Sequence, residues 1–135
     1  MTRALRLEVD APDGLRVLEQ VTALRLEAPD GALGVLPGHE RAVLALLPGP
    51  LVARRASGED VFVATEGGLA WVEPALVRVV TSWSAQASSL PRLLRLSERR
   101  ARLRRLTEDR LRTRLAAHDA ALRRVLAGLE REVAR

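Results

Sequence analysis

Short apolar segments separated by turn signals fill residues 1–90 of the chain. Residues 5–9 (LRLEV) alternate apolar and polar side chains, which is the period-2 pattern of a strand with one buried face. Turn signals recur about every ten residues, and the first of them is Ala-Pro-Asp-Gly at 11–14. This spacing predicts an all-β sandwich or barrel, with LPGP (47–50) and TEGG (65–68) among its turns.

A helical pattern replaces the strand pattern near residue 90. Residues 92–127 contain no Gly or Pro, and the strong helix formers Leu, Arg, Ala and Glu dominate this segment. Leu90-Pro91 suits a helix start, because proline is tolerated in the first turn of a helix. The C-terminal third of the chain is therefore predicted to be α-helical.

The leucines of this segment form two stripes at helical spacing, and the step of five residues from Leu106 to Leu111 breaks the phase between them. At the break, Thr107 is a suitable N-cap, and the acidic residues at 108–109 suit the positive end of a helix dipole. These features favour two amphipathic helices in a hairpin. One long helix with a stutter is the alternative, since no Gly marks the turn. The two stripes are Leu93, Leu96, Leu103 and Leu106, followed by Leu111, Leu115, Leu122, Leu126, Leu129 and Val133.

Charge divides the chain at the same place. Residues 1–90 carry 8 Arg against 11 acidic residues, a net −3, whereas residues 91–135 carry 14 Arg against 6 acidic residues, a net +8. We therefore expect a β-sandwich domain over residues 1–86 and an Arg-rich two-helix domain over residues 87–135. Aromatic residues make up only 2% of the chain, so the core should be aliphatic, with Trp71 and Trp83 as packing residues in the core or at its rim.

Several kinds of chemistry need residue types that the chain lacks. It has no Cys for disulfides or thiolate metal sites, and no Lys for a Walker A loop or a Schiff base. The first ten residues carry charges at Arg3, Arg6, Glu8 and Asp10, unlike a secretory signal, and the longest apolar run, 42–53, is too short to span a bilayer. We expect a soluble, cytoplasmic protein without direct membrane insertion.

The stretch DGALGVLPGHERAVLALLPGPL (30–51) contains His39, one of only two histidines in the chain. A zinc site would need two or three further ligands, and no close-spaced His/Cys pair is present to begin one. No Ser or Thr lies within fifteen residues of His39, which disfavours nucleophilic catalysis. Two hypotheses remain, a simple turn histidine or part of a surface that docks on another protein.

The segment RRARLRR (99–105) places five Arg on about two helical turns. It is explained by a solvated helix face, supported by i,i+4 pairs such as Glu108–Arg112 and Asp119–Arg123. Docking on an acidic protein surface is a second explanation. Nucleic-acid binding is a third, which is disfavoured because no aromatic residue is interleaved and the first domain is acidic.

Two segments of the chain resemble the epsilon subunit of F-type ATP synthases. Residues 30–51 are similar to that family's signature, a Gly-x-Leu-Gly, an apolar pair, Pro-Gly-His and a strand ending in Pro-Gly. Residues 66–82 (EGGLAWVEPALVRVVTS) resemble its later Gly-Gly strand pair. The resemblance covers the whole chain in length and order, but is specific only over residues 5–85. It implies a β-sandwich with a C-terminal helical hairpin.

The resemblance also implies a function and partners. The chain would be a non-catalytic central-stalk subunit of a proton- or sodium-translocating ATP synthase, cytoplasmic and peripheral on the inner face of the bacterial plasma membrane. The sandwich would pack on the gamma subunit and the ring of c subunits, and the helices would reach the alpha/beta head and inhibit hydrolysis. The implied docking loop for the c ring and gamma contains Asp30, Gly31, Leu33, Gly34, Pro37, Gly38, His39, Glu40 and Arg41. The implied regulatory tail contains Arg99, Arg100, Arg102, Arg104, Arg105 and Arg112.

One motif of the family is altered here. Some members bind ATP through a motif like Leu-Asp-x-x-Arg-Ala at the start of the first C-terminal helix. The matching stretch is LPRLLRL (90–96), in which Pro91 replaces the Asp and Leu94 the Arg. We therefore expect little ATP affinity, no cofactor and no metal. The rival hypothesis is a stand-alone β-sandwich adaptor whose Arg-rich arm binds nucleic acid, and an enzyme ranks third.

Overall fold

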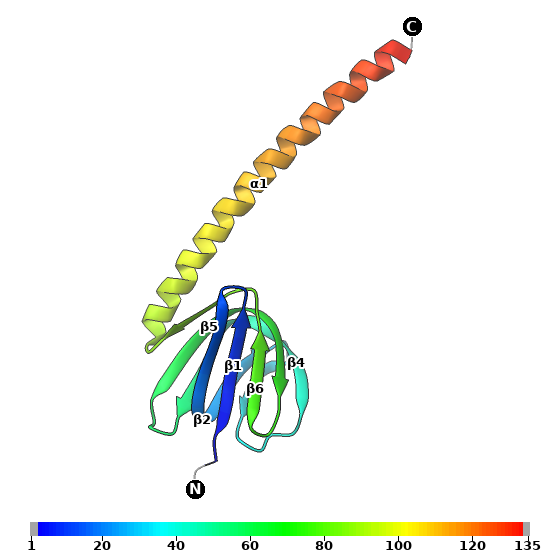
Figure 1. Ribbon diagram of the computed structural model, residues 1–135. Coiled ribbons are helices and arrows are strands. Elements are labelled where there is room, and N and C mark those ends of the chain that lie inside the picture. The colour runs from blue at the N-terminus through cyan, green and yellow to red at the C-terminus, as the bar shows by residue number, and fades with distance from the viewer. Residues whose placement is uncertain (1–2, 134–135) are drawn as a thin grey trace. The chain divides into compact units, whose positions relative to one another are not determined.

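The computed structural model describes residues 3–133, which form seven strands and one helix (Figure 1). The chain divides into two compact units, residues 1–97 and residues 98–135. The boundary predicted at 86/87 stays a prediction. The elements are β1 (Leu5–Ala11), β2 (Gly14–Ala28), β3 (Gly31–Val35), β4 (Ala42–Arg55), β5 (Asp60–Val72), β6 (Leu76–Val80), β7 (Ser84–Ala87) and α1 (Leu90–Val133).

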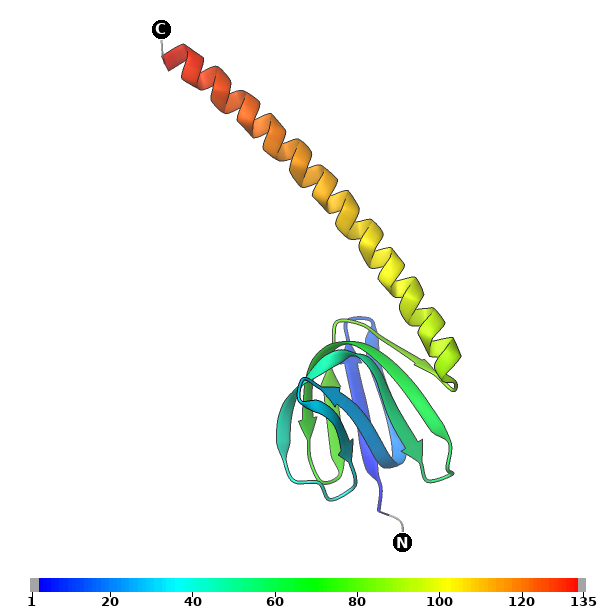
Figure 2. The same ribbon diagram turned by 180° about the vertical axis from the view of Figure 1, so that it is seen from behind.

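The strands of the first unit form a closed, barrel-like sandwich. The pairing runs β1–β6–β5–β4–β2 and returns from β2 to β1, while β3 extends from β2 and β7 from β5. All pairs are antiparallel except β1–β6. Figures 1 and 2 show the long strands curving around the sandwich. Closing the sheet removes most of its unpaired edges, which are sites of unwanted strand pairing. The predicted all-β architecture is confirmed.

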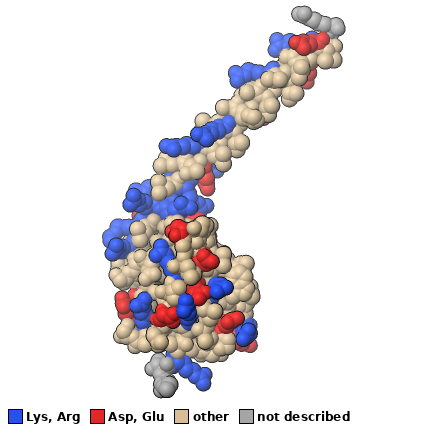
Figure 3. Space-filling view, in the orientation of Figure 1, with Lys and Arg blue, Asp and Glu red and all other residues tan. Residues whose placement is uncertain are grey.

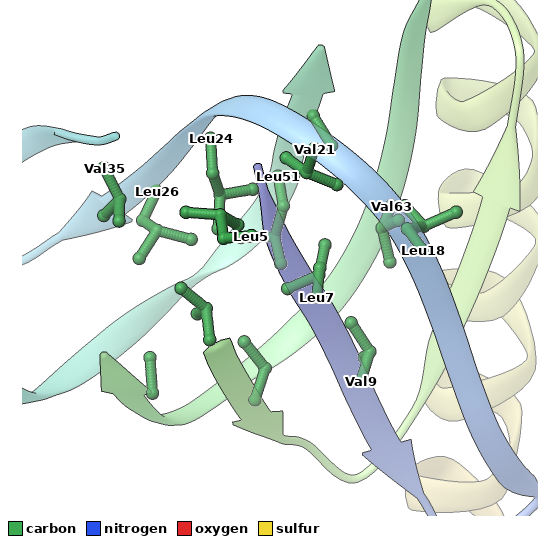
Figure 4. Close-up of a cluster of buried hydrophobic side chains, with 14 of the residues drawn as sticks. Leu5, Leu7, Val9, Leu18, Val21, Leu24, Leu26, Val35, Leu51 and Val63 are labelled. Carbon is green, nitrogen blue, oxygen red and sulfur yellow. The ribbon is translucent and has the colours of Figure 1, made fainter. Parts of the chain in front are cut away.

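The core of the sandwich is aliphatic, as its composition predicted. In β1, Leu5, Leu7 and Val9 are buried while Arg6 and Asp10 are exposed, which is the period-2 pattern of the sequence. The buried cluster contains only Leu, Val and Ala, and Figure 4 shows these side chains converging between the strands. Each fully buried Leu or Val side chain contributes roughly 1.5–3 kcal/mol relative to an exposed one, so this cluster is the main stabilising element of the unit.

Two of the predicted turns are wrong, because LPGP lies inside β4 and TEGG inside β5. The two strands stay paired through both segments, with Pro48 opposite Glu66. The glycines allow a bend rather than a reversal. Gly67 has a φ of 82°, and a Cβ there would stand 2.8 Å from the carbonyl oxygen of Leu46. Glycine is therefore required here by close backbone approach within a bent strand pair.

The C-terminal region is one helix, so the predicted hairpin is wrong and the long-helix alternative holds. Thr107 does not cap a second helix, because its Oγ1 donates a hydrogen bond to the carbonyl oxygen of Leu103 at 3.0 Å. Thr113 bonds Asp109 in the same way at 2.9 Å. Both hydroxyls are satisfied within a continuous helix, and no Gly or Pro interrupts residues 92–127. The predicted start is confirmed, since α1 begins at Leu90.

The first two turns of α1 belong to the sandwich unit. The backbone N–H groups of Arg92 and Leu93 donate to Ser89 Oγ and Ser89 O, at 3.4 and 3.1 Å, so Ser89 caps the helix. Leu93 is only 1% exposed. It packs in a second small cluster with Ala64, Ala85 and Ala87. This contact explains why the compact unit extends beyond the last strand.

A chain truncated after Ser97 should therefore keep the stability of the β-domain. Truncation after Ser88 should lower the free energy of unfolding by about 2–5 kcal/mol, because this is the usual cost of losing a buried leucine. Urea denaturation followed by circular dichroism measures both. The matched pair in the full chain is Leu93→Ala against Leu94→Ala, since Leu94 is about half exposed. Equal stability of the two truncated chains would show that Leu93 anchors nothing.

Candidate docking surfaces

The loop between β3 and β4 is held in a fixed conformation. Its turn closes through the N–H of His39, which donates to the carbonyl oxygen of Leu36 at 3.1 Å, and Gly38 takes a φ of 88°. The N–H of Gly38 donates at 2.8 Å to the carbonyl oxygen of Pro74, in the β5–β6 connection. Arg41 pairs with Glu73 of the same connection at 3.6 Å. The loop is thus tied to a second segment before any partner arrives.

His39 makes only local contacts in the described structure. Its Nδ1 lies 2.7 Å from the carbonyl oxygen of Glu40, and no other residue within 3–133 forms a hydrogen bond with the ring. No group of three or more His, Asp or Glu side chains gathers as metal ligands in that same range. The loop instead presents exposed Leu36, Glu40 and Arg41, a mixed apolar and charged surface.

The other members of the predicted docking loop lie along β3. Asp30 is in the β2–β3 turn, and Gly31 is the first residue of β3. Leu33 and Gly34 face Leu26 and Arg25 of β2 across the ladder. The set therefore spreads from the hairpin tip at 29–31, through Leu33 and Gly34 within β3, to the loop at 36–41. The structure does not gather all nine residues at one point.

An exposed apolar face, which sequence reasoning missed, crosses the outer side of β4, β5 and β6. Val43 lies opposite Trp71 in the ladder, and Leu69 lies opposite Val80. Side chains that alternate along a strand share one face, and here the second face of the sheet is apolar as well. The face consists of Val43, Leu69, Trp71 and Val80, which are 62%, 45%, 39% and 43% exposed. A continuous apolar run such as LAWV is the sequence signal that could have revealed this face, since it lacks the alternation of a strand with one polar side.

Trp71 stands between two hollows of the surface. One has a volume of about 380 Å³ and is lined by Trp71, Glu73, Leu76 and Arg78 among others. The second, of about 490 Å³, lies on the other side, along Gly68 and Leu69. Tryptophan is one of the residue types in which binding energy concentrates at protein interfaces. Trp83, the other tryptophan, instead packs against the buried cluster at the start of α1.

Charges border the apolar face, on β6 itself and on the neighbouring strands β1 and β2. Arg78 Nε donates to Glu8 Oε2 at 3.0 Å, and Arg6 bridges Glu8 and Glu19 at 3.1 and 2.9 Å. The Glu8 side chain is only 12% exposed, so this network is better ordered than a lone surface pair. It borders the apolar face with fixed charges of both signs, as the polar rim of an interface does.

The second unit, described by itself, is a single basic helix. All six residues of the predicted regulatory tail lie in α1, and Figure 3 shows basic side chains along it. The predicted pair of Asp119 with Arg123 forms at 3.1 Å, while Glu108 lies 3.8 Å from Arg104, one turn before it. The stripe leucines that lie within this unit, such as Leu103 and Leu115, are about half exposed. No helix within residues 3–133 combines the length and apolar character needed to cross a bilayer.

A barrel-like sandwich with an ordered loop and an exposed apolar face, followed by a basic helix, has the features of a docking subunit of a larger complex. Residues 4–85 match the family model described as "ATP synthase, Delta/Epsilon chain, beta-sandwich domain". The chain belongs to this family, as an epsilon subunit of an F-type ATP synthase, and is an accessory, non-catalytic part of that complex.

Curated relatives and solved structures agree with this family. The chain is 33% identical over 110 residues to an ATP synthase epsilon chain of Acinetobacter baumannii, covering 82% of this chain and 79% of that one. It is 35% identical over 81 residues to that of Acinetobacter baylyi, where the match spans 60% of this chain and 58% of the relative.

Two structures of mitochondrial ATP synthases contain similar chains. The first is the OSCP/F1/c-ring assembly of Euglena gracilis in rotational state 1, and its matching chain is 26% identical with a TM-score of 0.57. That match covers 64% of this chain and 54% of the Euglena chain. The second, the central stalk and c ring of Tetrahymena thermophila, matches at 15% identity and a TM-score of 0.51, with coverages of 62% and 69%. At that identity it supports the fold alone.

Proposed function

We propose that the chain is a rotor subunit of the central stalk, which couples the catalytic head of a proton- or sodium-translocating ATP synthase to its c ring. The exposed apolar face around Trp71 carries this proposal, because a contiguous exposed apolar surface marks a site where another protein binds. In this arrangement the protein is cytoplasmic and sits peripherally on the inner face of the bacterial plasma membrane, held there by the complex.

The two docking surfaces would serve two partners. The apolar face fits a stable contact with the gamma subunit, since apolar cores with fixed polar rims are typical of permanent interfaces. The loop at 36–41 fits the c ring, because it is already ordered and so binding would cost little conformational entropy. Asp30 and Gly31, at the far end of β3, would extend the second contact only if the c ring also reaches the hairpin tip.

The loop assignment can be tested with one introduced cysteine, because the chain contains none. Glu40→Cys in the assembled complex should cross-link to the c subunit. The matched control is Ser57→Cys, at an exposed position in the turn at the other end of β4. Cross-linking of the Ser57→Cys variant to the c subunit, with none from the Glu40→Cys variant, would place the opposite end of the sandwich on the ring.

The basic helix would act as a brake on ATP hydrolysis by docking on acidic surfaces of the alpha/beta head. Charge reversal at Arg99, Arg100, Arg102, Arg104 and Arg105 should then raise the hydrolysis rate. Each exposed pair is worth about 0–1 kcal/mol, so single changes should do little. Five together approach the roughly 5.5 kcal/mol that turns a 99:1 population into 1:99.

The comparison is the hydrolysis rate of the assembled complex with the wild-type and the five-fold variant chain, at low and high salt. The difference should shrink as salt rises, since the Debye length falls from about 10 Å at 0.1 M to about 3 Å at 1 M. Equal rates at low salt, with the variant shown to be assembled, would remove the inhibitory role.

A further inference from the structure

A basic hollow lies beside the β4–β5 turn, within the first unit. It is lined by Arg55 at the end of β4, Gln86 in β7, Ser88, and Arg92 in the first turn of α1, together with Glu59, Val61 and Ala87. Its volume of about 280 Å³ holds several water-sized groups at about 30 Å³ each. None of these residues belongs to the apolar face or to the loop at 36–41.

Arg55 has a buried donor without an acceptor. Its Nε is inaccessible to solvent and forms no hydrogen bond within residues 3–133. Its backbone is fixed, because its N–H donates to the carbonyl oxygen of Glu59 at 2.8 Å and its carbonyl oxygen accepts from Gly58 at 2.9 Å. Most buried donors in native proteins have partners, and a small shift of the Arg55 side chain into the hollow that it lines would bring this donor to an acceptor bound there.

Arg54, the preceding residue of the same strand, has hydrogen-bond acceptors for its guanidinium group. Arg54 donates from Nε and NH2 to the two carboxylate oxygens of Asp60, at 3.0 and 3.4 Å. This bidentate contact raises the pKa of Arg54, through the hydrogen bond to Asp60 and its charge. Side chains alternate along a strand, so Arg55 points to the other face of β4, where its Nε has no such acceptor in the described part of the chain.

The chemistry of the hollow selects an anion with oxygen acceptors. A guanidinium fork matches a carboxylate or phosphate, and Arg92 supplies a second one. The amide of Gln86 and the hydroxyl of Ser88 add neutral donors. The hollow also borders the start of a 44-residue helix, whose dipole favours negative charge at that end. We propose that this hollow is a binding site for a small oxyanion, a phosphate or a carboxylate group, held between Arg55 and Arg92.

The test uses the full chain and inorganic phosphate, titrated by calorimetry at constant ionic strength set with chloride. Phosphate affinity should fall about tenfold or more in Arg55→Gln and in Arg92→Gln, as expected for the loss of one charge-assisted hydrogen bond. The matched controls Arg54→Gln and Arg95→Gln remove the same charge from neighbouring positions and should bind as the wild type does. Glu59→Gln should bind phosphate more tightly, because it removes the one acidic side chain of the hollow.

A titration with acetate under the same conditions distinguishes the two ligand groups. Preferred binding of phosphate identifies a phosphate site, and equal binding of both anions identifies a site that accepts either group. ATP should bind no more tightly than phosphate, because only one anionic group is recognised.

The proposal is overturned if Arg55→Gln and Arg92→Gln bind phosphate as the wild type does, which would indicate adventitious ions along the basic helix. Tight ATP binding without phosphate binding would overturn it too. Arg92 is exposed, so its variant should fold normally even if Arg55→Gln does not.

Discussion

Replacing Gly68 with alanine should lower the free energy of unfolding of the β-domain by about 3–5 kcal/mol, the sum of backbone strain and overpacking. Gly68 has a φ of 139°, a conformation that L residues rarely adopt. A Cβ at this position would overlap the carbonyl oxygen of Val80 on the paired strand β6. Since whole domains are stable by only about 5–15 kcal/mol, this loss is a large fraction of the total.

Gly34→Ala is the matched control for this experiment. Gly34 lies in β3 with no atom within 4 Å of a Cβ and without a positive φ. Its variant should stay within about 0.5 kcal/mol of the wild type, as surface substitutions usually do. Urea denaturation followed by circular dichroism measures both. A Gly68→Ala variant as stable as Gly34→Ala would mean that β5 and β6 are not as close at this bend as described.

Trp71→Glu should weaken binding of the chain to the gamma subunit of its own complex by about 100-fold or more. Central tryptophans of interfaces cost at least about 2 kcal/mol on truncation, and here a charge is also placed in an apolar surface. The side chain is partly exposed on the outer face, so the fold should be unaffected. Calorimetric titration of gamma with each chain measures the change.

Leu94→Glu puts the same charge on a similarly exposed apolar residue outside the apolar face. It should leave gamma binding unchanged, while thermal unfolding confirms that both variants are folded. If the two variants bind gamma equally well, the apolar face serves another partner, and the assignment of gamma to it is wrong.

The local pattern of the sequence predicted the strands with one buried face well. Leu5, Leu7 and Val9 alternate with polar residues, and the structure buries that side of β1. It failed at LPGP and TEGG, because Pro and Gly mark a bend within paired strands as readily as a turn between them. Only the long-range pairing of Pro48 with Glu66 distinguishes the two, and that pairing is not a local property.

The helical region failed for a related reason. The apolar stripe does change phase between Leu106 and Leu111. Such a change ends a helix only if the backbone also contains a helix-breaking residue such as Gly or Pro, and residues 92–127 contain neither. Thr107 satisfies its hydroxyl inside the helix instead. The apolar run LAWV hinted at the apolar face, but its members Val43 and Trp71 come together only through the register of β4 and β5. The basic hollow was beyond prediction, since Arg55 and Arg92 line it together only in the folded unit.

The central claim is that this chain is built into the stalk of an ATP synthase, and affinity purification of the tagged chain from its own cells tests it most directly. The gamma and c subunits, with the alpha and beta subunits of the head, should be recovered in fixed ratio with the wild-type chain and lost with Trp71→Glu. Recovery of the tagged wild-type chain alone, or with nucleic acid in place of these subunits, would contradict the account.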